Sequence, residues 1–298
     1  MAVTRKQTQG SQESLNITRR KFLRAFGGTV LGAAAMGAGG WTYATKIEPN
    51  WFDVVPVELH LPRLDPAFSG FRLVQISDIH ASEAMTAAQV AEACQMVLAL
   101  KPDLVAITGD FVDARDGAQA ALKGLRSVLS ALSEQVQVVG VLGNHDYYAG
   151  AESVRQMMRT AQITDLTNGV LTLERSGSML HFAGLDDIWR GEPDLQKVLQ
   201  QTPDSGAAVI LVHEPDYART TSAAGRFDLQ ISGHSHGGQV ALPLLGPLVL
   251  PHLGKEFPSG LYQVGEMFQY TNRGLGTSYI RVRFNCRPEI TAFTLRSP

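Results

Sequence analysis

Five apolar runs in this sequence each stop at a group of residues of metal-binding type, and this pattern restricts the fold more than any other feature. In the clearest case Val136–Leu142 leads into Gly143-Asn144-His145-Asp146. An apolar run of this length predicts a buried strand, and open α/β sheets bind their ligands at the carboxyl ends of strands. The sequence therefore predicts a sheet with functional side chains along one edge.

The other four runs end in the same way. They lead into Ser77-Asp78-Ile79-His80, Gly109-Asp110-Phe111-Val112-Asp113, His213-Glu214-Pro215 and Gly233-His234-Ser235-His236-Gly237-Gly238. Five of the chain's eight histidines lie in these five short groups. Polar residues scattered through a core would not collect at successive strand ends, so we interpret the five groups as one active site.

The spacing of apolar residues predicts the elements between these motifs. Helical spacing is present in Thr86–Leu100 and Gln119–Leu132, and the alternation of apolar and polar residues in Trp51–Leu61 predicts an early strand. Strands and helices are expected to alternate from Phe71 to about Val212. This order of elements is typical of an α/β fold.

The last part of the chain is expected to consist of strands. After Gly233 no helical pattern remains, and three segments have the composition of strands: Gly260–Val264, Ser278–Val282 and Glu289–Leu295. Together with the preceding units they predict two packed sheets with helices outside. Because no linker follows Pro49, residues 46–298 are predicted to form a single catalytic domain.

The first 45 residues have the features of an export signal. Basic residues precede the apolar, Gly- and Ala-rich stretch Ala25–Met36. The pair Arg19 and Arg20, followed closely by Phe22-Leu23, resembles a twin-arginine signal. The segment 1–45 therefore predicts export through the twin-arginine translocase to the periplasm or the outer face of the cytoplasmic membrane. The alternative, an uncleaved membrane anchor, is disfavoured by six glycines between residues 25 and 45, which lower hydrophobicity and helix propensity.

Export also changes the charge of the remaining chain. Residues 1–44 contain six Lys and Arg residues and one acidic residue, so 26 − 6 = 20 basic and 28 − 1 = 27 acidic side chains remain. The remainder has a net charge of 20 − 27 = −7. An acidic domain gains nothing from counterion release on a nucleic acid, so a nuclease is disfavoured and no nucleic-acid partner is expected.

The residue types in the five groups indicate a metal centre. Carboxylates, imidazoles and an amide oxygen suit Mn²⁺, Fe or Zn²⁺ better than Ca²⁺ or a thiolate-bound structural zinc. They are too many for one ion. Two divalent ions about 3.5–4 Å apart would use them all and would clamp the attacking and leaving oxygens of a phosphoryl transfer.

These motifs occur in the order and spacing of the calcineurin-like metallophosphoesterases, which the chain resembles from about Pro56 to Leu295. The residues that carry the resemblance are Asp78-x-His80, Gly109-Asp110, Gly143-Asn144-His145-Asp146, His213 and Gly233-His234-Ser235-His236. The resemblance implies a four-layer sandwich of two mixed β-sheets flanked by helices. It also implies one metal on Asp78, His80 and His236, a second on Asn144, His213 and His234, and a bridge between them at Asp110.

The same resemblance implies the reaction, which is hydrolysis of a phosphoric ester by in-line attack of a hydroxide that bridges the ions. His145 is then the acid that protonates the leaving oxygen or binds the phosphoryl group. Asp113 matches the residue that orients this histidine in protein phosphatases, and its alternative role is a helix cap. The arginine that binds phosphate in those enzymes is replaced by Ala114, which argues against protein phosphatase activity.

Within the family, the chain resembles the twin-arginine-exported bacterial phosphodiesterases of the YkuE/YaeI type. The features are the signal, Lys46-Ile47-Glu48-Pro49, the extended histidine motif to Gln239, Gly274-Leu275-Gly276 and Pro288-Glu289-Ile290. That branch resembles pyrophosphatases of UDP-2,3-diacylglucosamine, which implies a phosphodiester or pyrophosphate bond, in a lipid-linked substrate such as this compound or in a phospholipid. The alternatives are a soluble extracytoplasmic phosphomonoesterase or nucleotidase, and a catalytically silent binding module, in which ligand positions would be eroded.

One further segment bears on the substrate. Ala241–Pro251 is apolar but too rich in Pro and Gly to form a single helix or strand. We expect it either to receive acyl chains or rest on a bilayer beside the metals, or to fold onto the core. Asp186, Asp187 and Trp189 fit either a substrate pocket or an ordinary turn.

Overall fold

The computed structural model describes residues 37–113 and 118–298. The chain divides into two units, Met1–Thr42 and Tyr43–Pro298. Of the first unit the described residues 37–42 are helical, and residues 1–36 of the predicted export signal lie outside the described residues. None of the described helices is long and apolar enough to cross a membrane. Both large sheets belong to the second unit.

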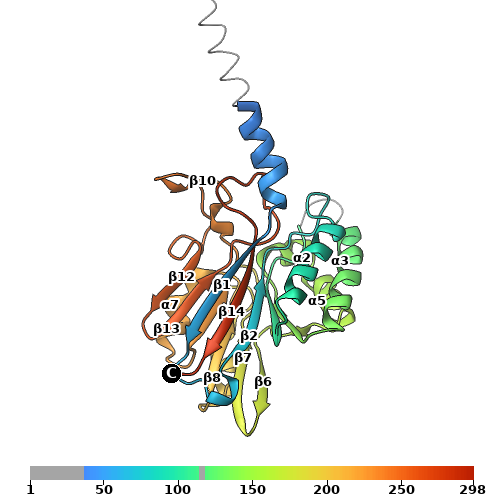
Figure 1. Ribbon diagram of the computed structural model, residues 1–298. Coiled ribbons are helices and arrows are strands. Elements are labelled where there is room, and N and C mark those ends of the chain that lie inside the picture. Colours follow the sequence, from blue (N-terminus) through green and yellow to red (C-terminus); the bar gives the residue numbers. More distant parts are fainter. Residues whose placement is uncertain (1–36, 114–117) are drawn as a thin grey trace, which may run out of the picture. The chain divides into compact units, whose positions relative to one another are not determined.

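The first large sheet has six strands. Their order is β1 (Asp53–His60), β14 (Glu289–Arg296), β2 (Phe71–Ile76), β3 (Leu104–Thr108), β4 (Val138–Val141) and β5 (Thr164–Asp165). All neighbours are parallel except β14 and β2, which are antiparallel. The last strand of the chain therefore lies between its first two strands (Figure 1).

The second large sheet also has six strands. Their order is β12 (Gly260–Val264), β13 (Met267–Thr271), β9 (Leu229–Ser232), β8 (Ala207–Leu211), β7 (Ser178–Gly184) and β6 (Gly169–Arg175). The outer pairs β12/β13 and β7/β6 are antiparallel and the inner pairs are parallel. Both sheets are thus mixed, as predicted.

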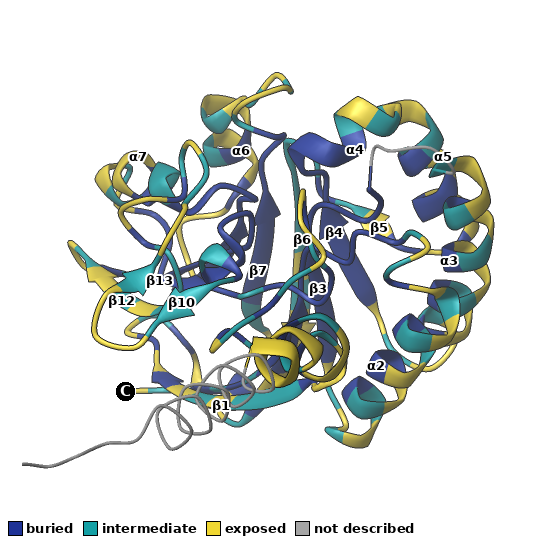
Figure 2. Cartoon of the chain, turned by 90° about the horizontal axis from the view of Figure 1, so that it is seen from above, coloured by how far each residue is buried: buried dark blue, intermediate teal, exposed yellow. Residues whose placement is uncertain are grey.

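Side chains of the strands pack alternately on the two faces of each sheet, because successive residues of a strand point to opposite sides. In β3, Leu104 and Ala106 belong to the core between the sheets, whereas Val105 and Ile107 belong to the core beneath the helices. Helices α2 (Ala87–Ala99), α3 (Ala118–Ser133) and α5 (Ala151–Thr160) cover the first sheet, and α6 (Leu195–Gln201) and α7 (Ala218–Ala223) cover the second (Figure 2). The predicted four-layer α/β sandwich is confirmed.

The five predicted motif strands are β2, β3, β4, β8 and β9, and all of them lie in the parallel parts of the two sheets. Parallel neighbours end at the same edge of a sheet, so the polar groups that follow them are brought together. Hydrogen bonds join the groups. The amide of Asp78 donates to the carbonyl of Gly109 over 3.0 Å, and the amide of His234 donates to the carboxylate of Asp78 over 3.0 Å.

The strand predicted at Ser278–Val282 is wrong. Tyr279 has a φ of 58°, a left-handed conformation that no strand accommodates, and both Tyr279 and Ile280 are exposed. The backbone of Ser278 bonds instead to the side chain of Gln239, donating to Oε1 over 2.9 Å and accepting from Nε2 over 2.8 Å. The side chain of Gln239 thus provides the hydrogen bonds that a neighbouring strand would otherwise make. The alternation of apolar and polar residues in the sequence does not reveal such a long-range contact.

Two further features differ from the predicted order of elements. β6 and β7 form an antiparallel hairpin, so strands and helices do not alternate throughout the first part of the chain. β13 pairs with both β12 and β9, although its sequence was not predicted as a strand. Each difference adds a strand at or near the edge of the second sheet.

The apolar segment Ala241–Pro251 does not fold onto the core. It contains a short hairpin of β10 (Ala241–Leu242) and β11 (Gly246–Pro247). Leu244 and Leu245 at its tip are 106% and 77% exposed, and Leu248 and Val249 beyond it are exposed as well. Of the two alternatives stated for this segment, folding onto the core is therefore not observed. We call residues 241–249 the apolar hairpin.

Candidate active site

All nine site residues predicted from the sequence are buried and lie at the carboxyl ends of the motif strands. They are Asp78, His80, Asp110, Asp113, Asn144, His145, His213, His234 and His236. Three overlapping groups of these residues place their ligand atoms within 4.8 Å of one another, a spacing that a metal ion requires. The structure thus brings the predicted residues together, whereas the individual ligand and acid roles remain predictions.

Asp110 stands at the centre of the cluster. Its Oδ2 atom lies 3.4 Å from Nε2 of His80 and 3.3 Å from Nε2 of His213. Its other oxygen, Oδ1, accepts a hydrogen bond of 2.8 Å from the amide of His145. One carboxylate therefore faces histidines of both predicted ligand groups, which is compatible with the bridging role implied by the sequence.

The first predicted ligand group lies on one side of Asp110. Nε2 of His80 and Nε2 of His236 are 3.0 Å apart, and Nε2 of His236 is 3.3 Å from Oδ1 of Asp78. Burial lowers the pKa of His80 to about 3 and lowers the pKa of His236 well below its usual value. Both imidazoles are therefore neutral at neutral pH, which is the form that binds metal ions.

The second predicted group lies on the other side. Nε2 of His213 is 3.3 Å from Nδ1 of His234. The remaining ring nitrogens are held by backbone carbonyls, Nδ1 of His213 by Thr108 over 2.7 Å and Nε2 of His234 by His252 over 2.7 Å. Such contacts place an N–H on the outer nitrogen, so that a metal ion in the cluster would meet the electron pair of the inner one.

Asn144 supplies the amide oxygen of the second group. Its Oδ1 atom is buried, and no described residue donates a hydrogen bond to it. A buried carbonyl oxygen without a donor is unfavourable by roughly 1–3 kcal/mol, and a cation removes this cost. The donor set and this orphaned oxygen both fit a metal centre.

The motif glycines allow the loops to approach one another. A Cβ atom on Gly143 would lie 2.4 Å from Oδ1 of Asp110, and one on Gly233 would lie 2.1 Å from Oδ2 of Asp78. Neither position has room for a side chain. The glycines in these motifs therefore permit the backbone to pass directly over the carboxylates.

Asp146 ties the loop after β4 to the loop after β3. Its carboxylate accepts hydrogen bonds from the amides of Phe111, Val112 and Gly143, over 2.9, 3.3 and 3.0 Å. The last contact caps α4 (Asn144–Ala149), which begins directly after Gly143. Asp146 is thus a positioning residue that the sequence motif contained without revealing its function.

His145 lies beside the cluster. Its Nδ1 atom is 3.7 Å from Oδ1 of Asp113, and its Nε2 atom is 3.3 Å from Oγ of Ser278. Burial lowers the pKa of His145, but the neighbouring carboxylates of Asp113 and Asp110 outweigh burial, so the pKa is raised. These contacts favour a protonated imidazole next to the cluster.

A buried brace lies behind the first ligand group. Arg283 is fully buried and donates hydrogen bonds to the carbonyls of Arg273, Gly274 and Gly276, over 2.9 and 3.0 Å for the first two. The amide of Gly276 in turn donates to the carbonyl of Asp78 over 2.8 Å. The sequence carried no signal for this brace, because a lone arginine is usually exposed.

A cavity of about 140 Å³ opens beside the cluster and is lined by both predicted ligands and aromatic residues. The lining includes the predicted site residues Asp110, Asn144, His145 and His234 and the aromatic residues Trp189 and Tyr279. Trp189 was named in the sequence analysis without a reason to choose between pocket and turn. The structure places it at the cavity.

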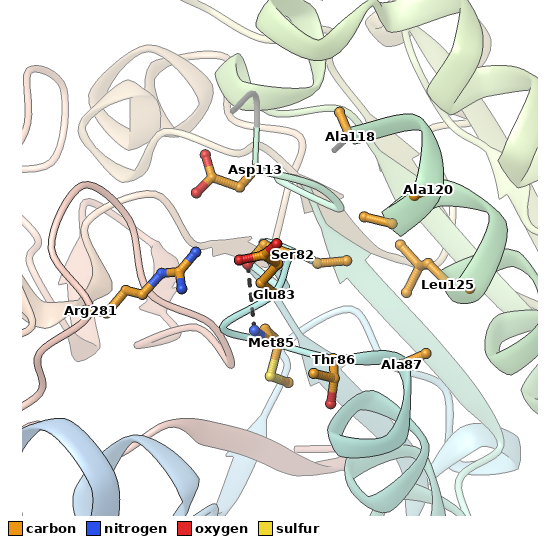
Figure 3. A pocket seen from close by; sticks show the side chains of 13 residues that line it. Ser82, Glu83, Met85, Thr86, Ala87, Asp113, Ala118, Ala120, Leu125 and Arg281 are labelled. Atoms are coloured by element: carbon orange, nitrogen blue, oxygen red, sulfur yellow. Dashed lines mark hydrogen bonds between the residues drawn. The ribbon is translucent and has the colours of Figure 1, made fainter. Parts of the chain in front are cut away.

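A second, larger cavity of about 500 Å³ lies beside Asp113 and the amino-terminal part of α3 (Figure 3). Its charged residues are Glu83, Asp113 and Arg281, which come from three different segments. Asp113 therefore lines this cavity as well as facing His145.

The chain is similar to known metallophosphoesterases. The family model described as calcineurin-like phosphoesterase matches residues 71–238. The metallophosphoesterase YkuE of Bacillus subtilis is 35% identical over 283 residues, which are 94% of this chain and 98% of that protein. The phosphodiesterase YaeI of Escherichia coli is 30% identical over 285 residues, 94% of this chain and 99% of that protein. The UDP-2,3-diacylglucosamine pyrophosphatase LpxG of Chlamydia muridarum is 26% identical over 310 residues, 84% of this chain and 91% of that protein.

Proposed function

Because the chain belongs to the calcineurin-like metallophosphoesterases, in the branch that contains YkuE and YaeI, we propose that it hydrolyses phosphodiester or pyrophosphate bonds of a lipid-linked substrate with two divalent metal ions. Family membership makes it a metal-dependent phosphoric ester hydrolase. The proposal further includes that there are two ions, that they are Mn²⁺, Fe or Zn²⁺, and that the substrate is lipid-linked.

The proposed metal centre uses the seven clustered ligand residues. Asp78, His80 and His236 would hold one ion, Asn144, His213 and His234 the other, and Asp110 would contact both. Ions bound there would supply Lewis-acid stabilisation of the phosphoryl oxygens and a nucleophilic hydroxide at neutral pH. The observation that supports a shared carboxylate is the position of Oδ2 of Asp110 between His80 and His213, at 3.4 and 3.3 Å.

His145 has the position of an acid for the leaving group. It lines the same cavity as Asp110 and Asn144, and its raised pKa favours the protonated form. We propose that Asp113 orients the ring from the Nδ1 side, so that Nε2 holds a proton towards the leaving oxygen. The proton then moves from Nε2 to that oxygen as its bond to phosphorus breaks.

The main support for a lipid-linked substrate is a cavity of about 260 Å³, lined mostly by apolar surface, next to the cluster of predicted metal ligands. Its lining includes the predicted ligands His234 and His236 together with Val249 and Ile280, and Val249 belongs to the exposed apolar hairpin. Contiguous exposed apolar side chains are typical of surfaces that contact lipid or protein. An acyl chain could make apolar contacts all the way from the hairpin to the predicted metal-binding residues. A soluble nucleotide or phosphomonoester has no acyl chain and would leave these contacts unused.

We expect that Leu245→Ser combined with Leu248→Ser lowers kcat/KM on micellar UDP-2,3-diacylglucosamine by about tenfold, because the loss of apolar contact with the lipid costs about 1.4 kcal/mol or more. Hydrolysis of the soluble substrate bis(4-nitrophenyl) phosphate should stay within about twofold. The two rates are measured on the same metal-loaded preparation.

Leu261→Ser is the matched control, because Leu261 is also exposed but lies in β12 outside the hairpin. It should change neither rate. A parallel loss of both activities in the hairpin variant would make the hairpin a structural element. Unchanged hydrolysis of the lipid would remove the support for a lipid-linked substrate.

We also propose that the protein is exported through the twin-arginine translocase and acts in the periplasm or at the outer face of the cytoplasmic membrane. The support is the sequence pattern around Arg19 and Arg20. Arg19→Lys combined with Arg20→Lys is expected to leave the full-length chain in the cytoplasmic fraction, whereas Arg24→Lys is the control and should be exported. Protease accessibility in spheroplasts measures the outcome, and export of the double variant would contradict the proposal.

A further inference from the structure

We propose that Tyr148, Trp189 and Arg190 form a subsite for a second phosphate of the substrate, the one carried by the leaving group. We call these three residues the aromatic–arginine stack. The inference rests on the proposed function, because only a substrate with a pyrophosphate linkage carries a second phosphate next to the bond that is cleaved.

The guanidinium of Arg190 is held between two aromatic rings. Its central carbon lies 4.7 Å from the ring centroid of Trp189 and 4.9 Å from that of Tyr148. Nε of Arg190 donates a hydrogen bond of 2.8 Å to the hydroxyl of Tyr148. Stacking and this hydrogen bond restrict an otherwise flexible side chain, so less conformational entropy is lost when it binds a ligand.

Arg190 is exposed, and its terminal nitrogens are not used in the hydrogen bonds of the turn that carries it. Within residues 37–113 and 118–298 its guanidinium donates only the bond from Nε. Two N–H groups of a planar fork are therefore available to an external acceptor. This geometry suits two phosphate oxygens better than any other common acceptor except a carboxylate.

Buried carboxylates hold the turn that carries the stack. Oδ1 of Asp187 accepts hydrogen bonds from the amides of Trp189 and Arg190, over 3.1 and 2.5 Å. Glu214 accepts from the amides of Ile188 and Trp189, over 3.1 and 3.2 Å. These four contacts hold the turn in a single backbone conformation.

The same turn is connected to the metal cluster through its neighbours. Glu214 directly follows the predicted ligand His213. Asp186, at the start of the turn, accepts a hydrogen bond of 2.5 Å from the hydroxyl of Tyr147, which precedes Tyr148 in α4. The acids of the turn therefore contact both Trp189 and the residue that precedes Tyr148, although the two segments lie about 40 residues apart in the sequence.

The stack lies next to the cluster, and Trp189 lines the cavity there. The ring of Tyr148 makes an edge contact with His145 at 5.7 Å, and the ring of Trp189 makes one with His234 at 6.3 Å. Arg190 therefore lies between the predicted acid and a predicted ligand, outside the cluster itself. A group attached to the leaving oxygen would pass this position.

The charge of the site supports an anionic ligand at Arg190. The cluster contains the carboxylates of Asp78, Asp110 and Asp113, and the position of the phosphate-binding arginine in protein phosphatases is Ala114 here. A second phosphate would lie beyond the ions and would need its own cation. Arg190 is a cation that lies next to the cluster, on the rings of Tyr148 and Trp189.

Arg190→Gln is expected to lower kcat/KM on a pyrophosphate-linked substrate, UDP-2,3-diacylglucosamine, by about 10- to 100-fold, mainly through KM. Hydrolysis of bis(4-nitrophenyl) phosphate, which has no second phosphate, should change by less than about threefold. Arg190→Lys should restore only part of the loss, because an ammonium group lacks the planar fork and stacks less well. Arg219→Gln is the matched control, since Arg219 is exposed and pairs with Glu256 away from the site.

An inhibition experiment tests the subsite independently of the natural substrate. Uridine diphosphate should inhibit hydrolysis of bis(4-nitrophenyl) phosphate, and its Ki should rise about tenfold in Arg190→Gln but not in Arg219→Gln. An unchanged Ki would overturn the proposal. Equal losses on every substrate would also overturn it, because Arg190 would then act on the structure of the site. If the native enzyme cleaves no pyrophosphate but its Ki depends on Arg190, the subsite stands and the proposed function fails.

Discussion

Replacement of Asp110 by asparagine is expected to lower kcat by about 1,000-fold or more, which corresponds to roughly 4 kcal/mol of transition-state stabilisation. The carboxylate of Asp110 faces His80 at 3.4 Å and His213 at 3.3 Å, so an amide would remove one negative charge from the point where the two proposed ligand groups meet. The hydrogen bond from the amide of His145 to Oδ1 can be kept by the asparagine oxygen. The backbone of the site should therefore remain in place.

The measurement is hydrolysis of bis(4-nitrophenyl) phosphate by Mn²⁺-loaded protein, together with metal content and the melting temperature before and after chelation by EDTA. Native protein should lose about 5–10 °C on chelation, because saturating metal stabilises the folded state by roughly 2.7 kcal/mol at a hundred times Kd. Asp110→Asn should show a smaller loss. A variant that retains both the native rate and the native response to EDTA would contradict the central position of Asp110.

Asp228→Asn is the matched control for a buried carboxylate. Asp228 is 3% exposed, pairs with Arg63 over 3.0 Å and accepts from the amide of Ala208, all outside the metal cluster. Its replacement should lower the melting temperature while kcat stays nearly unchanged. This contrast separates loss of the metal centre from a general loss of stability.

Replacement of His145 by alanine is the second large effect that we expect, with a loss of kcat of about 10²–10⁴-fold and little change in KM. The loss should depend on the leaving group. An alkyl phosphodiester needs a proton on its departing oxygen, whereas the weakly basic nitrophenolate needs little help. The ratio of native to variant kcat, measured with both substrates, should therefore be much larger for the alkyl ester.

His181→Ala is the control for removal of a buried imidazole. His181 is buried and its ring nitrogens bond to Thr172 and Ser205 over 2.8 Å each, away from the cluster. Its replacement should affect stability without a dependence on the leaving group. Equal losses for alkyl and nitrophenyl esters in His145→Ala would show that His145 binds the phosphoryl group or supports the site rather than acting as the acid.

The clustering of the candidate site residues was predictable because the position of each depends on a short stretch of chain. An apolar run buried on both faces is recognisable from composition, and a polar group directly after it must lie at the end of that strand. Asp78, Asp110 and Asn144 follow three neighbouring parallel strands, so the fold class alone brings them to one edge. His213 and His234 reach the same place from the second sheet for the same reason.

The error at Ser278–Val282 shows the limit of local patterns. The segment has the composition of a strand, yet its backbone bonds to the side chain of Gln239, which is 39 residues away. Apolar composition also suggested that the apolar hairpin could pack on the core, whereas Leu244 and Leu245 are exposed. Composition reports how a residue partitions between water and an apolar phase, and it does not report whether the fold provides a surface for it.

Residues that act through distant contacts could be found only in the folded chain. Tyr148 and Arg190 are 42 positions apart and Arg283 supports a loop beneath Asp78, and none of these residues belongs to a recognisable motif. The order of strands and the chemistry of the metal cluster follow from periodicity and from residue type, which are properties of neighbouring residues along the chain. The shape of the cavity beside the cluster depends on how separate loops pack against each other, and that packing is set by contacts between residues far apart in sequence.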